Sequence, residues 1–300
     1  MKDLTLATLG ARTAPLGVRF WDTTSASFVG DGLRVTAYPV ADPRRRSSAR
    51  PNASRVWVFH ELAGMGKVQR GEGDAAFWAS PPALRAYVLD VDDELGRFVP
   101  FQLSVNAPVR GLLPWSPPAG LAFVGLPPNA VPLFPSATRA VPQGMGVIRA
   151  DLWDPDAPTP PGLKGPGGPA AWALVTATVD GLANVRGIAD AQGRVALIFA
   201  YPGPLGGGSS GLTGVPLTKQ TWPVTLEVRY APAVGKAPAR AKLPDVLTQA
   251  SGSLWQTWDA NPAARQKLAP TTLMLKYEMP LAVATTAGPP GGVLYTTQGP

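Results

Sequence analysis

Short runs in which apolar and polar residues alternate recur along this chain of 300 residues. In the clearest of them, residues 222–230, apolar side chains occupy every second position from Val224 to Tyr230. Because successive side chains of a strand point to opposite faces, this pattern predicts a strand with one buried and one solvated side. Similar runs predict further strands at 16–21, 33–38, 55–59, 85–91, 98–105, 146–153 and 273–279. No helix-length amphipathic run separates the N-terminal strands, which favours β-sandwiches over a parallel α/β sheet.

One turn element occurs twice. An Asp-x-x-Gly-Arg sequence followed by an apolar run lies at 190–194 and again at 93–97. At the downstream copy, the runs 171–181 and 187–199 surround the turn, an arrangement typical of a short loop that joins two antiparallel strands. The repeat predicts two small β-sandwich modules in one chain.

The distribution of strands and prolines divides the chain into four parts. We predict an N-terminal β-sandwich at 1–110, a Pro-rich connector at 111–139, a second β-sandwich at 140–235 and a C-terminal extension at 236–300. The predicted fold class is mainly β, with two Ig-like or transthyretin-like sandwiches and long Pro/Gly-rich loops. The extension is expected to hold short helical turns, one strand and a tail that is either flexible or docked on a partner.

Proline is dense between residues 107 and 135, and proline has no amide to donate to a sheet. This segment is either an ordered linker lying over a domain or an arm that docks on a neighbouring subunit. Two stretches, in the connector and in the tail, are apolar enough to add a strand to a partner's sheet. The residues expected to bind in this way are Leu121, Phe123, Val293, Leu294 and Tyr295. Deletion of 284–300 is then expected to weaken assembly and to leave the melting temperature of the isolated protein nearly unchanged.

Composition adds limits on the class of protein. The 35 prolines and 33 glycines are well above the usual combined share of roughly 12%, yet they punctuate strand-like runs, which indicates rigid loops and not an unfolded chain. The absence of cysteine excludes disulfides and thiolate metal sites. The first ten residues are too polar for a signal peptide, and no stretch approaches the roughly eighteen apolar residues of a membrane span. We therefore expect a soluble protein made in the cytoplasm.

The net charge of +7 has one dense source, Arg44 to Arg46 with Arg50 nearby. These cations are not interleaved with stacking aromatics, so nucleic acid is not the expected partner. A solvated loop is the simpler interpretation, and contact with a phosphate or an acidic partner is the alternative.

The sequence contains fragments of catalytic and metal-binding motifs, but none is complete. Gly207 to Gly211 matches G-x-S-x-G around Ser209, yet the following residues cannot start the helix that this motif needs. His60 is the only histidine and has no second histidine four residues on, so a zinc site of that type is excluded. We expect no catalytic residues, no cofactor and no enzyme activity.

A cluster of carboxylates offers a weak calcium site. The candidate ligands are Asp90, Asp92, Asp93 and Glu94. Their spacing does not match the EF-hand loop, so a solvated hairpin turn is the alternative. A weaker cluster of the same kind is formed by Asp151, Asp154 and Asp156.

The nine tryptophans carry a further signal. Trp57 and Trp172 fall within predicted strands and are expected in a core. Trp115 and Trp255 lie in loop contexts, as do Trp78 and Trp258, where tryptophan often serves an interface or a sugar platform.

A resemblance to known families begins at the second module. Residues 147–153 and 172–201, with the turn Asp190 to Val195, resemble a carboxypeptidase-regulatory-like, transthyretin-like β-sandwich. The two-module arrangement, with Phe98-Val99-Pro100-Phe101 and a Pro-rich middle, resembles proteins encoded with phage-tail-like contractile injection systems. This resemblance implies a structural or adaptor subunit of a baseplate, cap or tail, incorporated into the particle and bound to its other subunits. The alternative is a carbohydrate- or cell-surface-binding module that uses the loop tryptophans.

Overall fold

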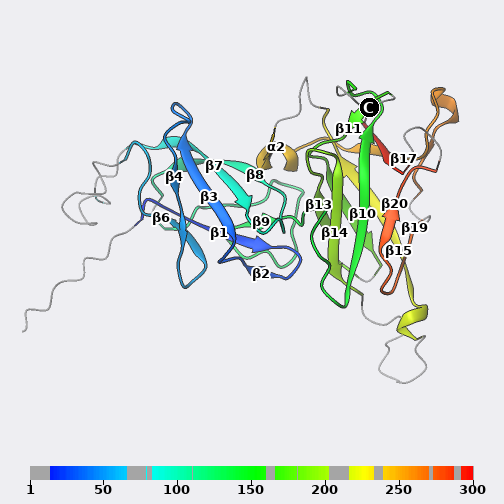
Figure 1. Cartoon of the computed structure of the whole chain (residues 1–300), viewed down its shortest axis with the longest axis horizontal. Helices are drawn as coiled ribbons and strands as arrows, with labels where there is room; N and C mark the ends of the chain where they lie inside the picture. The colour runs from blue at the N-terminus through cyan, green and yellow to red at the C-terminus, as the bar shows by residue number, and fades with distance from the viewer. Residues whose placement is uncertain are drawn as a thin grey trace, which may run out of the picture.

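The computed structural model describes residues 14–65, 79, 83–109, 111–159, 166–180, 182–202, 216–232, 239–269, 273–286 and 292–299. Strand accounts for 47% of the structure and helix for 5%, which confirms the mainly-β class. Figure 1 shows two groups of strands side by side along the long axis, the blue-to-cyan group from the first part of the chain and the green-to-red group from the rest.

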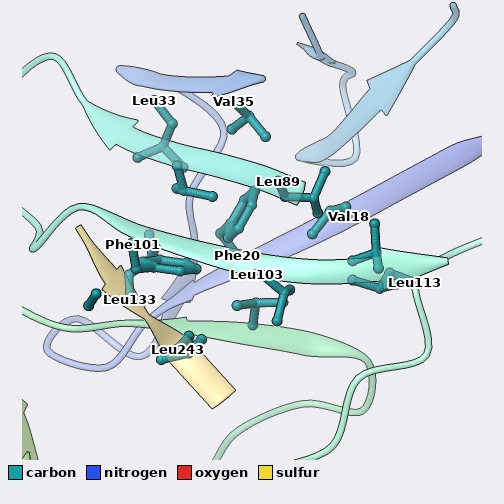
Figure 2. Packing of buried hydrophobic residues seen from close by; sticks show 14 of the residues in the cluster. Val18, Phe20, Leu33, Val35, Leu89, Phe101, Leu103, Leu113, Leu133 and Leu243 are labelled. Atoms are coloured by element: carbon teal, nitrogen blue, oxygen red, sulfur yellow. The ribbon is translucent and has the colours of Figure 1, made fainter. Parts of the chain in front are cut away.

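The first group consists of two sheets. One sheet has the order β2 (Ser27–Phe28), β1 (Leu16–Asp22), β6 (Val56–Phe59) and β5 (Arg50–Pro51), with β9 (Ala130–Leu133) parallel to β1. The other has the order β16 (Ala241–Lys242), β8 (Phe101–Ala107), β7 (Arg85–Asp93), β3 (Leu33–Pro39) and β4 (Ser47–Ser48). Every second side chain of β8 is buried, as the alternating pattern predicts. Buried side chains of both sheets form one continuous core (Figure 2).

The second group also has two sheets. The larger contains β11 (Gly168–Pro169), β10 (Met145–Asp154), β14 (Arg194–Ala200), β20 (Leu281–Val283), β21 (Leu294–Gln298), β17 (Gly252–Thr257) and β18 (Gln266–Lys267). The smaller has the order β13 (Val185–Ile188), β12 (Leu174–Val179), β15 (Thr221–Arg229) and β19 (Leu273–Lys276). Two 3-10 turns, Leu217–Lys219 and Pro262–Ala264, connect strands. On β15, Trp222, Val224 and Val228 face a second core, so the predicted amphipathic strand is confirmed.

The chain crosses twice between the two groups after β15. It first enters the N-terminal group, where β16 pairs in parallel with the start of β8 and the short helix α2 (Leu243–Leu247) follows. Leu243, Val246 and Leu247 are buried in the first core, and Figure 2 shows Leu243 among residues of β1, β3, β7 and β8. The chain then returns to supply β17 to β21 to the second group. We call the two groups of strands the first and the second sandwich. The segment 236–300, expected as an extension, thus contributes to both of them.

The Pro-rich connector also packs on its own chain. The guanidinium of Arg149 on β10 donates to the carbonyls of Ala137 and Arg139, the latter at 3.0 Å. Arg186 on β13 donates to the carbonyl of Ala122 and lies over the Phe123 ring at 5.0 Å. Both arginines belong to the second sandwich, so they fasten the connector to it. The structure therefore corresponds to the ordered-linker interpretation.

The two Asp-x-x-Gly-Arg turns have the same internal bonding. In each, the glycine amide donates 3.0 Å to the aspartate carbonyl, and the arginine donates from its backbone and side chain to the carboxylate. Gly96 and Gly193 take φ of 67° and 79°, which glycine adopts without a side-chain clash. The upstream turn joins β7 and β8, which pair antiparallel. The downstream turn instead joins β13 and β14, whose partners are β12 and β10, so the predicted hairpin there is a corner between two sheets.

The buried position of α2 leads to a stability prediction. We expect Leu243→Ala to lower the free energy of unfolding by about 2–5 kcal/mol, because it removes a fully buried side chain from the first core. Leu84→Ala is the matched control, since Leu84 is 66% exposed and should change stability by no more than about 0.5 kcal/mol. Urea denaturation measures both values. Equal, small effects would show that α2 is not part of the core.

Candidate functional site

The tail residues predicted to bind a partner lie inside the protein. β21 pairs in parallel with β10, with Trp153 opposite Tyr295, and antiparallel with β17. Leu294 and Tyr295 are each 1% exposed, and the half-buried Val293 accepts a hydrogen bond from the Thr285 amide through its carbonyl. The prediction that this strand docks on another chain is wrong, because its sheet and its core are supplied by its own chain.

The connector residues differ from expectation in the same way. Leu121 is 3% exposed in the first core. Phe123 is half-buried and meets the Phe134 ring edge-on, with centroids 5.9 Å apart. Only Val124 of this stretch is a large exposed apolar residue, at 74%. The predicted strand donor at 121–124 is therefore also wrong.

The loop tryptophans are half-buried and make contacts within the chain. Trp115 packs against the first core. Trp255 is on β17, donates 3.1 Å to Thr297 Oγ1 and meets Trp258 edge-on. Trp258 in turn stacks on Tyr295 and carries the Arg265 guanidinium 3.5 Å from its ring centre. The use of these rings as a sugar platform stays a prediction, and Trp78 lies outside the described residues.

The carboxylates of the acidic turn form ion pairs with arginines. Asp90 pairs with Arg46 and Arg240 at 3.1 Å each. Asp92 pairs with Arg34 and, at 3.1 Å, with Arg240. Burial raises the pKa of Asp92, but the hydrogen bonds from these two arginines outweigh burial and leave the pKa lowered.

The other two carboxylates complete the same picture. Asp93 is paired with Arg97 at 3.0 Å, while Glu94 is exposed. Within the described ranges, no three histidine, aspartate or glutamate side chains gather in a metal-binding arrangement. The calcium prediction for Asp90, Asp92, Asp93 and Glu94 is therefore wrong.

The remaining motif residues do not converge. His60 is exposed just after β6, and Ser209 lies outside the described residues. Asp154 is buried, with Tyr230 donating 3.0 Å to one carboxylate oxygen and the Asp156 amide 2.9 Å to the other. Burial raises the pKa of Asp154, and it also raises the pKa of Tyr230. This pair ties β10 to the residue that follows β15, which makes it a structural contact between the two sheets of the second sandwich.

A cleft of about 410 Å³ opens in the first sandwich, where the turns after β1, β2, β5 and β7 meet the connector. Its lining residues are Asp22, Ser25, Ser27, Phe28, Val29, Gly30, Asp31, Asn52, Arg55, Arg97, Phe98 and Arg139. The volume falls within the range of about 300–1,000 Å³ that is usual for small-molecule sites. This cleft could not be located from the sequence, because its residues come from four separate segments, 22–31, 52–55, 97–98 and 139.

A buried ion pair between Asp22 and Arg139 lines the cleft. Arg139 donates to both carboxylate oxygens of Asp22 at 2.9 and 2.7 Å, and the two side chains are only 11% and 7% exposed. Thr24 and Ser25 also donate to this carboxylate, each at 2.8 Å. Burial raises the pKa of Asp22, but the hydrogen bonds from Arg139, Ser25 and Thr24 outweigh it, so the pKa is lowered. The Arg139 guanidinium also lies 4.9 Å from the Phe98 ring centre, which fixes the connector against the sandwich.

A second arginine is held beside this pair. Arg97 bonds to the Asp93 carboxylate at 3.0 Å and donates 2.9 Å to the Asp31 carbonyl. Its guanidinium also lies over the Phe98 ring, 5.1 Å from the ring centre. Both cations therefore have protein partners and are fixed in position before any ligand arrives.

Removal of the tail tests the internal role of β21. We expect a chain ending at residue 284 to unfold at a clearly lower temperature than the full chain. Loss of Leu294 and Tyr295 alone removes two buried side chains that each contribute roughly 1.5–3 kcal/mol. Differential scanning calorimetry checks this, and an unchanged melting temperature would restore the docking interpretation.

The Asp22–Arg139 pair generates a prediction about pH. At neutral pH, Asp22→Asn should lower the free energy of unfolding by about 3–5 kcal/mol, because it leaves Arg139 buried without its counter-ion. The folded-state pKa of Asp22 lies below its ordinary value of 3.8, so its stabilisation is present above that pH and is lost as pH falls through the folded pKa. The difference between wild type and variant should therefore shrink in acid. Asp31→Asn is the control, since the Asp31 side chain is 82% exposed, and a constant difference across the acid range would contradict the assignment.

Comparisons with known proteins do not name a family for this fold and cleft. No protein-family model and no curated protein matches the chain. Among the described residues, no helix has both the length and the apolar character needed to cross a bilayer. The function must therefore be argued from the structure itself.

Proposed function

We propose that this chain is a non-enzymatic structural or adaptor subunit of a phage-tail-like contractile injection particle. The observation that carries the proposal is the double crossing of the chain between its two sandwiches. Segment 241–247 is packed in the first sandwich, although in the sequence it follows β15 and precedes β17, which both belong to the second. A subunit built in this way resists being pulled apart at a single linker, which suits a part of a particle that bears mechanical load.

Side-chain contacts strengthen the same connection. Trp172 lies two residues before β12 of the second sandwich, yet its side chain belongs to the first core and is 5% exposed. It holds φ of 64°, a left-handed value that costs an ordinary residue roughly 1–2 kcal/mol. Arg149 and Arg186 add hydrogen bonds from the second sandwich to the connector. These contacts favour a rigid spacer over a flexible two-domain protein.

Contacts with other subunits would then lie on the outer surface of the folded chain. The two extended arms that could have reached a neighbour are used within the chain, as the burial of Leu121 and Tyr295 requires. Exposed arginines at 44, 45 and 50 remain available for an acidic partner surface. Subunit contacts would then be made by a preformed surface, with little loss of conformational freedom.

Particle assembly in the producing cell tests this function. We expect purified particles to contain the chain, and deletion of its gene to give incomplete or inactive particles visible by electron microscopy. Complementation with wild type should restore them, and Leu84→Ala should do so equally, since that side chain is exposed. Complementation with Trp172→Ala should fail at temperatures where this variant unfolds. Normal, active particles from the deletion strain, with no chain in the wild-type particles, would refute the proposal.

A further inference from the structure

Arg55 has an unusual backbone in the turn between β5 and β6. Its φ is 55°, in the left-handed region that favours glycine. The turn itself is stabilised by Asn52, whose side-chain oxygen accepts from the Ser54 and Val56 amides at 3.0 Å each. Glycine at position 55 would fit this turn without strain, so the turn does not explain the arginine.

Arg55 is an exposed residue of the cleft lining. A Cβ on Gly30 would lie only 2.9 Å from Arg55 Cγ, so the absence of a side chain at Gly30 makes room for the arginine stem. The guanidinium then donates 2.9 Å to the Phe28 carbonyl. Gly32 makes room for Arg97 in the same way, since a Cβ there would lie 2.8 Å from Arg97 Nη2. Two glycines of one loop thus position two arginines on the cleft wall.

The charged side chains of the lining differ in whether they are paired. The lining holds three arginines and two aspartates, and Asp93, just outside it, adds a third carboxylate. Arg139 is neutralised by Asp22, and Arg97 by Asp93 with Asp31 at its edge. Arg55 has no carboxylate partner anywhere in the described part of the chain. A planar guanidinium with free donors is suited to a carboxylate, which it can bind through two parallel hydrogen bonds.

The rest of the lining is suited to hydroxyl groups and one apolar face. Ser25 and Ser27 hydroxyls lie 2.8 Å apart at the wall, and the Asn52 side-chain amide group makes no hydrogen bond to the described residues. Phe28 is half-buried, its ring makes a T-shaped contact with Trp21 with the two centroids 5.0 Å apart, and the Arg19 guanidinium lies over it 5.2 Å from the ring centre. Hydroxyl-binding side chains beside an aromatic ring are the groups that a sugar ring requires.

We propose that this cleft binds a small acidic sugar, with Arg55 holding its carboxylate and Ser27 and Asn52 bonding its hydroxyls. The site is separate from Trp255 and Trp258 and does not depend on a role in a particle. The arginine in a strained turn is explained, because its guanidinium is the ligand-binding group.

Calorimetric titration of the full chain with D-glucuronate, D-glucose and inorganic sulfate tests the proposal. Glucuronate should bind, glucose should bind at least about tenfold more weakly, since it lacks the charge, and sulfate should also bind more weakly, since it lacks the ring. Equal binding of glucose or of sulfate would overturn the proposal, and so would no binding of glucuronate.

Arg55→Gly gives a variant whose failure cannot be attributed to unfolding. Glycine removes the guanidinium and relieves the left-handed backbone, so the melting temperature should stay the same or rise. Glucuronate affinity should fall about tenfold or more. Arg44→Ala, which removes an exposed arginine outside the cleft, should bind glucuronate like wild type. If Arg55→Gly binds as well as wild type, or Arg44→Ala loses affinity equally, the site is not the cleft.

Discussion

Burial of α2 and Trp172 in the first core is the interaction on which the rest of the structure depends. Both come from sequence beyond residue 170, so the first sandwich is not complete until the second half of the chain has been made. α2 and Trp172 each cover apolar side chains of β1–β9 that would otherwise be exposed to solvent. Burial of such surface is the main favourable term in folding. The two sandwiches are therefore coupled, and local damage in one should be felt in the other.

The local part of this fold was predictable from sequence, because strand formation and turn chemistry are encoded by neighbouring residues. Alternation on β8 and β15 identified strands correctly, and both Asp-x-x-Gly-Arg sequences form turns, although only the upstream one joins a pair of antiparallel strands. The same signals could not say which strands pair. β16, β20 and β21 pair in parallel with strands far away in sequence, and such contacts leave no local pattern. The apolar strand of the tail was therefore predicted to bind another chain, although it pairs with β10 of its own chain.

The cleft was not predictable for a related reason. Asp22 and Arg139 are separated by 117 positions, and nothing in either local sequence relates them. At the acidic turn the prediction was wrong for a different reason: clustered carboxylates suggested a metal ion, and their partners are arginines that lie far away in the sequence. In a chain of net charge +7, arginine is the abundant counter-ion for each aspartate. An acidic cluster in such a chain should first be matched to its own arginines.

The pairing of charged side chains also bears on the role of Arg55. Several buried and half-buried carboxylates in this protein are paired with arginines: Asp22 with Arg139, Asp93 with Arg97, Asp90 with Arg46 and Arg240. Other arginines without a carboxylate either donate to backbone carbonyls, as the half-buried Arg149 and Arg186 do, or are exposed, as Arg44 is. Arg55 is exposed as well, but its stem is fitted against Gly30 and its backbone is left-handed, while it has no carboxylate partner among the described residues. Placement that specific, without an internal counter-ion, is what a cation positioned for a ligand requires.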